Sequence, residues 1–169
     1  MKKIMILVLS AVLLLSMTAC ACTGDQAASG STPVPSPTEA PDPINTAALA
    51  DIMTAILKDA PIEMVTGESA IEEERFSWVF GIEPIEGAEG YSSEAMISSI
   101  AHSIALLRVP EGTDAAEVAK QIEEKADPRK WICVEAEKTI VRQRGNVVLL
   151  VMSKADIADA VADAFDSYR

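Results

Sequence analysis

The pattern of apolar and polar positions divides the chain into three regions. Residues 4–17 are almost wholly apolar, residues 21–45 are polar and rich in proline, and from residue 46 onward apolar positions recur with helical and strand periods. These periods predict one domain over residues 46–169, since that length suits a single hydrophobic core. The first two regions lack the patterned apolar positions that a folded core requires.

Two helical segments open the predicted domain. The first has an apolar stripe at i, i+3, i+4, i+7 and i+8, capped by Asn45 or Thr46 and ended before Pro61. The pattern Ser69-x-x-Glu72 predicts a capping box that begins a second helix, and Gly81 is suited to end it. The first stripe consists of Leu49, Ile52, Met53, Ile56 and Leu57.

Three further helical segments lie in the second half of the chain. Thr113 or Asp114 caps a helix that runs to Asp127. The pair Asp127-Pro128 then predicts a short helix with proline at its first position, with Trp131 as its core anchor. The pattern Ser153-x-x-Asp156 begins a closing amphipathic helix.

Strands are predicted between these helices. Residues 91–109 fit either helical spacing or two strands with a break near Ser98-Ser99, and we favour strands because the serines weaken a helix. Thr139–Gln143 and Asn146–Ser153 read as two strands joined through Arg144-Gly145. The second of these, NVVLLVMS, is apolar on both faces and belongs in the centre of a sheet. The predicted fold class is α+β, a small and mainly antiparallel sheet with helices packed on it.

The N-terminus resembles a bacterial lipoprotein signal. Lys2 and Lys3 precede the apolar run, which is shorter than the roughly 20 residues of a transmembrane helix. Met17-Thr18-Ala19-Cys20 resembles a lipobox, which implies that residues 1–19 are removed and that Cys20 carries fatty acyl chains such as palmitate. Two or more acyl chains hold a protein on a membrane stably. An ordinary cleavable signal followed by a free thiol is the alternative.

The segment after the predicted anchor has the composition of a spacer. Five of the nine prolines of the chain lie in residues 21–45, among Ser, Thr, Gly and Ala. Such a sequence buries too little apolar surface to offset its ordering entropy. We expect residues 20–45 to be the lipidated cysteine and a disordered tether; a proline-motif docking site is the alternative.

The charge of the chain limits its partners. The net charge is −12, and removal of Lys2 and Lys3 leaves 12 basic against 26 acidic residues, a net charge of −14. This balance excludes nucleic acid as an expected partner, because such binding depends on Lys and Arg contacts with phosphates. It also disfavours broad contact with anionic lipid, so a partner drawn by charge is cationic.

The three cysteines do not form a recognisable metal motif. Cys20 and Cys22 supply two ligands, whereas a structural zinc site takes four, and only Cys133 and His102 remain. No metal or other cofactor is expected. A Cys22–Cys133 disulfide is chemically allowed outside the cytoplasm. We predict instead that Cys133, between apolar neighbours, is a small buried hydrophobe.

No spacing in the sequence singles out a catalytic group. The one histidine, His102, lies near Ser98, Ser99 and Ser103, but no G-x-S-x-G elbow surrounds these serines. We expect His102 to be a partly exposed or hydrogen-bonded strand residue. No two carboxylates stand out as a glycan-cleaving pair. Residues Glu83, Glu86 and Glu89 lie in one loop and could converge on calcium, although they lack a calcium-loop pattern.

The order of these features resembles a family of small lipoproteins of Gram-positive bacteria that is known only as a domain of unknown function. The resemblance covers residues 47–169 and is carried by FGIEPIEGAEGY, DAAEVAKQIEEKAD and RGNVVLLVMSKAD, after the lipobox and the tether. It implies no activity and no functional residues. We expect a lipoprotein on the outer face of the cell membrane, a non-catalytic binding or assembly module with an envelope protein as partner. An envelope hydrolase with scattered active-site residues is the alternative.

Overall fold

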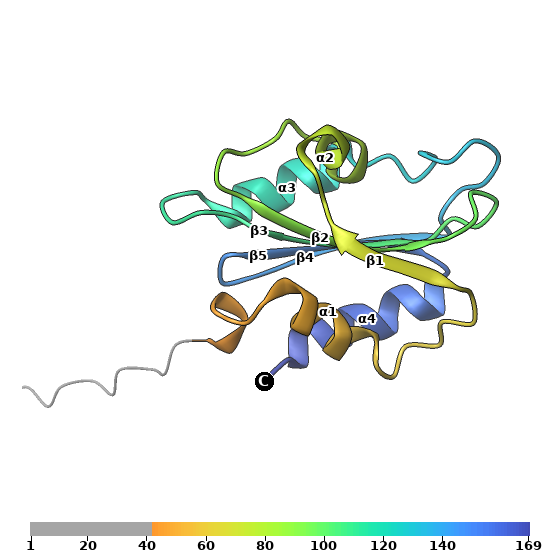
Figure 1. The fold of residues 1–169 in the computed structure, drawn as a ribbon, viewed down its shortest axis with the longest axis horizontal. Helices are drawn as coiled ribbons and strands as arrows, with labels where there is room; N and C mark the ends of the chain where they lie inside the picture. Colours follow the sequence, from red (N-terminus) through yellow and green to blue (C-terminus); the bar gives the residue numbers. More distant parts are fainter. Residues whose placement is uncertain (1–41) are drawn as a thin grey trace, which may run out of the picture. The chain divides into compact units, whose positions relative to one another are not determined.

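The computed structural model describes residues 42–169, so the predicted signal peptide, the anchor at Cys20 and Cys22 lie outside the described residues. The described chain forms a five-stranded sheet with helices on both faces (Figure 1). Within this part of the chain, no helix is long and apolar enough to cross a membrane. In chain order the elements are the 3-10 helix η1 (Pro43–Asn45), α1 (Leu49–Leu57), β1 (Thr66–Ala70), α2 (Glu73–Phe80), β2 (Glu89–Ala95), β3 (Ser103–Arg108), α3 (Ala115–Lys125), β4 (Lys138–Arg144), β5 (Val147–Ser153) and α4 (Ala155–Ser167).

The sheet has the strand order β1-β2-β3-β5-β4, and every neighbouring pair is antiparallel. The predicted α+β class is therefore confirmed. Strand β5 lies between β3 and β4, and all seven of its residues are buried. This confirms the central position predicted from the run NVVLLVMS, because a strand covered on both faces is apolar on both.

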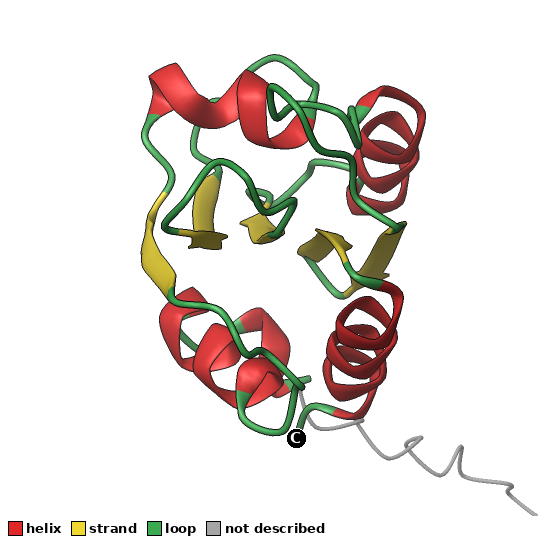
Figure 2. Ribbon diagram, turned by 90° about the vertical axis from the view of Figure 1, so that its right-hand side faces the viewer, coloured by secondary structure: helices red, strands yellow, loops and turns green. Residues whose placement is uncertain are grey.

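Two cores lie on opposite faces of the sheet. Helices α1 and α4 cover one face, and α2 and α3 cover the other, so that helices flank the strands on two sides (Figure 2). Side chains of β3 alternate between the cores, as a pleated strand requires. Ile104 and Leu106 pack with α1 and α4, whereas Ala105 and Leu107 pack with α2 and α3.

Several local predictions are confirmed. Residues 91–109 form strands β2 and β3, and Ser98-Ser99 lies in the connection between them. Helix α2 ends at Gly81, which takes the left-handed conformation with φ of 73°. Helix α3 begins after Asp114, whose carboxylate accepts hydrogen bonds from the backbone N–H groups of Ala116 and Glu117. Gly145 turns the β4–β5 hairpin with φ of 58°.

Both predicted capping boxes are wrong. Ser69 belongs to β1, and Ser153 is the last residue of β5. The helices begin later, α2 at Glu73 and α4 at Ala155, where the backbone N–H of Ala155 donates to the Glu137 carboxylate at 3.2 Å. Pairing within the sheet takes precedence over the local capping pattern in both places, because the strand bonds satisfy the backbone of the two serines.

The predicted starts of two other helices are also wrong. Neither Asn45 nor Thr46 caps α1, whose N-cap is Ala48. Asn45 closes the preceding η1, and its side-chain oxygen accepts from the backbone N–H of Asn146 at 2.9 Å. No helix follows Asp127, which accepts from the backbone N–H of Arg129 at 2.9 Å and stabilises a turn instead.

The segment after this turn corrects the prediction for Cys133. Residues 126–137 are irregular and run over the surface, and the Cys133 side chain is exposed rather than buried. Its neighbour Ile132 is 93% exposed, whereas Trp131 is half-buried against the core under α2 and α3. Apolar neighbours in sequence therefore do not bury Cys133, since the segment has no regular face to place against the core.

Candidate functional site

An apolar groove lies where two connections of the fold meet. Glu63, Met64 and Val65 come from the segment between α1 and β1, and Met96, Ile97 and Ile100 come from the segment between β2 and β3. Lys154, between β5 and α4, completes the lining, and the groove encloses about 520 Å³. Its volume is that of a site for a side chain or a small ligand.

The groove brings together apolar side chains that are exposed to water. Val65, Met96 and Ile97 are 77%, 66% and 57% exposed. They are three of the five large apolar side chains exposed among residues 42–169; the other two are Trp78 and Ile132. Single exposed apolar residues are common, but a contiguous group with a hollow shape is typical of an interaction site.

The groove and the point where the chain enters the domain lie at opposite ends of the sheet. Val65 and Met96 adjoin the strand ends at Thr66 and Ala95 and share the backbone bond from Met96 N–H to the Val65 carbonyl. The entry segment at Asp42 contacts Arg144, at the other end of the strands. Figure 1 shows the orange segment that follows Asp42 and the β2–β3 connection on opposite sides of the sheet.

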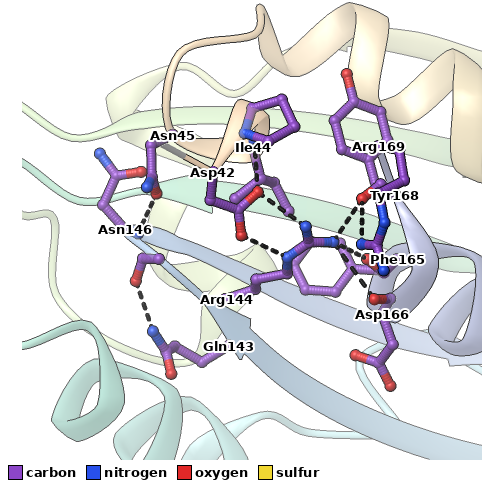
Figure 3. A network of polar contacts seen from close by, with 12 residues as sticks. Asp42, Ile44, Asn45, Gln143, Arg144, Asn146, Phe165, Asp166, Tyr168 and Arg169 are labelled. Atoms are coloured by element: carbon purple, nitrogen blue, oxygen red, sulfur yellow. Dashed lines mark hydrogen bonds and ion pairs between the residues drawn. The ribbon is translucent and has the colours of Figure 1, made fainter. Parts of the chain in front are cut away.

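Arg144 holds the entering chain against the C-terminal helix. Its guanidinium donates two hydrogen bonds to the Asp42 carboxylate, at 2.6 and 2.8 Å (Figure 3). A third nitrogen donates to the carbonyls of Phe165 and Tyr168, at 3.2 and 2.8 Å. The hydrogen bonds from Arg144 hold the pKa of Asp42 below its usual value. The sequence assigned Asp42 to the tether, whereas these contacts hold it on the domain.

Replacing Arg144 with methionine is expected to release the entry segment. The amide of Asn45 donates to the Asp42 carbonyl, so its hydrogen exchange should accelerate about tenfold or more when the charged hydrogen bonds are lost. Arg142→Met is the control, because Arg142 is half-exposed and forms a 3.5 Å surface ion pair. Equal exchange rates of Asn45 in both variants would show that Arg144 does not hold this segment.

A buried polar cluster lies on the α2/α3 face, at the same end of the sheet as the groove. The Lys130 ammonium donates to the Ser103 hydroxyl at 2.9 Å and lies 3.9 Å from the Glu94 carboxylate. The Ser103 hydroxyl in turn donates to Glu94 at 3.2 Å. The ammonium also lies 4.1 Å from the ring centre of Trp78, a cation–π distance. Burial lowers the pKa of Lys130 to about 8, although the Glu94 charge opposes this shift.

His102 lies on the other face of the sheet. Its Nδ1 is 2.8 Å from the Ser153 hydroxyl, and both side chains are fully buried. The structure thus confirms a hydrogen-bonded histidine, but it is buried rather than partly exposed, and its hydrogen-bond partner is Ser153. Burial lowers the pKa of His102 to about 4, since no charged group compensates the ring for lost water.

These contacts include two arrangements that hydrolases use, Ser103 beside Lys130 and Ser153 beside His102. A lysine with a lowered pKa or a neutral histidine can accept a proton from a serine hydroxyl. Both serines, however, are 0% exposed. A substrate carbonyl cannot reach either hydroxyl in this conformation. The polar contacts therefore hold strand ends and the 126–137 segment together rather than present a nucleophile.

Stability is expected to fall between pH 6.5 and pH 4 because of His102. The unfolded chain binds a proton to this histidine below pH 6.5, whereas the folded protein resists it until about pH 4. The folded state should thus be about 2 kcal/mol less stable at pH 5 than at pH 7.5 from this group alone. Urea unfolding at both pH values measures the difference. The His102→Gln variant should lose most of this pH dependence, and an unchanged slope would contradict the assignment.

The acidic loop residues do not come together. Glu89 forms a 3.4 Å ion pair with Arg108 instead of joining Glu83 and Glu86. Across residues 42–169 no three acidic, histidine or cysteine side chains are placed to hold a metal ion. A calcium ion bound to this loop would raise the melting temperature of the protein in millimolar calcium. An unchanged melting temperature would rule out the calcium site.

Sequence reasoning did not find the groove. Its apolar residues come mainly from Met64-Val65 and Met96-Ile97, two pairs that are 32 positions apart in the numbering and lie next to strand ends. The sequence feature that could have indicated the groove is an apolar pair in each of two segments that connect helices or strands. Their meeting depends on the β1–β2 register, and β1 itself was not predicted.

Comparison with known proteins finds no family model that matches the chain, no matching curated protein and no matching solved structure. The resemblance to small lipoproteins stays a prediction from sequence. Function is therefore inferred from the residues and geometry of this chain.

Proposed function

We propose that the protein is a lipoprotein held on the outer face of the cell membrane through Cys20, and that its domain is a non-catalytic module that binds an envelope protein. The observation that carries the binding role is the apolar groove with the exposed side chains of Val65, Met96 and Ile97. Exposed apolar side chains around a hollow are costly to keep in water without a partner.

The placement of the groove suits a tethered module. A tether of residues 21–41, at about 3.1 Å per residue, spans about 65 Å when fully extended. It joins the domain at Asp42, at the far end of the sheet from Val65 and Met96. A domain pulled toward the membrane at Asp42 therefore presents the groove outward, where an envelope protein can reach it.

The charge of the domain defines the partner further. The chain carries a net charge of −12, and Glu63 and Lys154 line the groove beside the apolar side chains. Complementary charge speeds association and selects among partners. The partner surface is therefore apolar where it enters the groove and basic overall, because the net charge of the chain is acidic.

Affinity capture with the full chain tests this function. A protein retained from detergent-solubilised envelopes by the wild type should be lost with Ile97→Glu, because a charge in the groove opposes apolar docking. Ile132→Glu is the matched control, since Ile132 is also exposed but lies outside the groove. Equal capture by both variants, or no retained protein, would rule out docking in the groove.

The alternative, an envelope hydrolase with scattered active-site residues, is favoured by the 2.9 Å contact of Lys130 with Ser103. It requires a conformation that opens Ser103 to substrate. Ester and peptide hydrolysis by the full chain should then fall at least about a hundredfold in Ser103→Ala. Activity that persists in this variant and in His102→Ala, or none in the wild type, removes the hydrolase.

A further inference from the structure

We propose that the free edge of β1 receives an extended, cationic segment of the partner as a sixth strand, whose apolar side chain enters the groove. This inference rests on the proposed binding function and adds the mode of recognition. Strand addition is a common way to bind extended peptides, with backbone bonds for affinity and pockets for selectivity.

The register of β1 shows which backbone groups are free. The N–H of Met96 donates to the carbonyl of Val65, and the N–H of Ile71 donates to the carbonyl of Gly90. In an antiparallel pair, hydrogen-bonded positions alternate with positions whose N–H and C=O point away. Thr66, Glu68 and Ala70 therefore direct their backbone groups outward, to the side of the sheet that has no further strand.

The edge of β1 is open to a strand of opposite charge, because its one charged side chain is Glu68. Its five residues TGESA contain no lysine and no proline, and the register with β2 runs without a bulge from Thr66 to Ala70. The opposite edge, β4, carries Lys138, Arg142 and Arg144, each paired with an aspartate. Of the two edges of this sheet, β1 is the one suited to accept a strand.

The charge around β1 selects a cationic segment. Between Asp59 and Glu74 the chain carries acidic side chains and no lysine or arginine. The acidic residues of this stretch are Asp59, Glu63, Glu68, Glu72, Glu73 and Glu74. An approaching acidic strand would meet like charges, whereas a basic strand gains from opposite charges across the new pair.

The groove continues this edge. Val65 lies directly before β1, so a strand paired with Thr66 and extended by one or two residues passes over Val65. At this point an apolar side chain of the added strand can enter the 520 Å³ groove beside Met96 and Ile97. Backbone pairing and apolar docking therefore use one continuous surface.

Two other occupants of the edge are disfavoured. A second copy of the chain would pair β1 with β1 and bring Glu68 beside its twin, between two molecules of net charge −12 each. The tether of residues 21–41 contains Asp25 and Glu39 and no basic residue. Its prolines also lack the N–H groups that a sixth strand must donate.

Peptide binding to the detergent-solubilised full chain tests the inference. The probe is capped Lys-Val-Lys-Val-Lys-Val-Lys, with the Glu-Val counterpart as the charge control. The cationic peptide should bind more tightly at low salt and slow the hydrogen exchange of the Thr66, Glu68 and Ala70 amides. The amides of Gly67 and Ser69 already face β2 and should change less.

The variant Glu68→Pro separates strand addition from simple charge attraction. It removes an outward N–H without removing a bond to β2, so the fold should survive while peptide affinity falls about tenfold relative to Glu68→Gln. Melting temperatures of both variants verify the fold.

Three results with the variants and the amides would overturn the inference, and a fourth concerns the peptide alone. They are equal affinity in Glu68→Pro and Glu68→Gln, binding without protection of the outward amides, and protection of those amides without peptide, which would place the tether or a second copy on the edge. Failure of the cationic peptide to bind would also overturn it. Loss of captured envelope protein with Ile97→Glu would still support the proposed function, so the two failures are distinguishable.

Discussion

Replacing Cys20 with alanine is expected to move the protein from the membrane fraction to the soluble extracytoplasmic fraction. Each buried methylene of an acyl chain contributes about 0.8 kcal/mol to membrane binding, and two chains together hold a protein stably. The loss from the membrane fraction should be nearly complete, as measured by fractionation and immunoblotting.

Cys22→Ala is the matched control for the anchor. It removes a thiol two positions away and leaves the predicted lipobox Met17–Cys20 unchanged. This variant should stay in the membrane fraction and keep the mass of the acyl chains. If Cys20→Ala stays at the membrane like Cys22→Ala, the lipid anchor is not at Cys20 and the alternative of an ordinary cleavable signal gains support.

Replacing Leu150 with alanine is expected to lower the free energy of unfolding by about 4 kcal/mol. Leu150 is fully buried in the central strand β5, within the core that α2 and α3 cover. Truncation removes buried apolar contacts and leaves a cavity that neighbouring strands on both sides cannot easily fill. Urea unfolding with an unchanged m-value measures the loss as a change in stability alone.

Val141→Ala is the control for the central place of β5. Val141 lies opposite Leu150 in the register, on the edge strand β4, and is half-buried. Its truncation should lower the free energy of unfolding by only about 1 kcal/mol, because the Val141 side chain buries less apolar surface on folding than that of Leu150. Similar losses at both positions would contradict the strand order β3-β5-β4.

Long apolar patterns predicted the fold better than short polar ones. The run NVVLLVMS identified β5 because six consecutive apolar residues, bounded by Asn146 and Ser153, are typical of a strand that is covered on both faces. Ser69 and Ser153 carry the spacing of capping boxes but lie in strands, since the sheet satisfies their backbone groups first. β1 was missed because TGESA lacks the β-branched and aromatic residues of typical strands.

The candidate site was less predictable than the fold, for a physical reason. Val65 and Met96 meet only because β1 pairs with β2 in one register, and a slip by one residue would turn their side chains to other faces. Likewise Lys130 reaches Ser103 from an irregular segment whose path no local pattern specifies. The net charge of −12, in contrast, can be read from the sequence, and it favours a cationic partner.

Photo-crosslinking in intact cells tests the central claim most directly. A photoreactive phenylalanine replaces Ile97 in the full chain, and a second version carries it in place of Ile132, outside the groove. We predict a covalent adduct with one envelope protein from position 97 and none of that mass from position 132. An adduct of equal yield from both positions, or no protein adduct from position 97, would contradict docking in the groove.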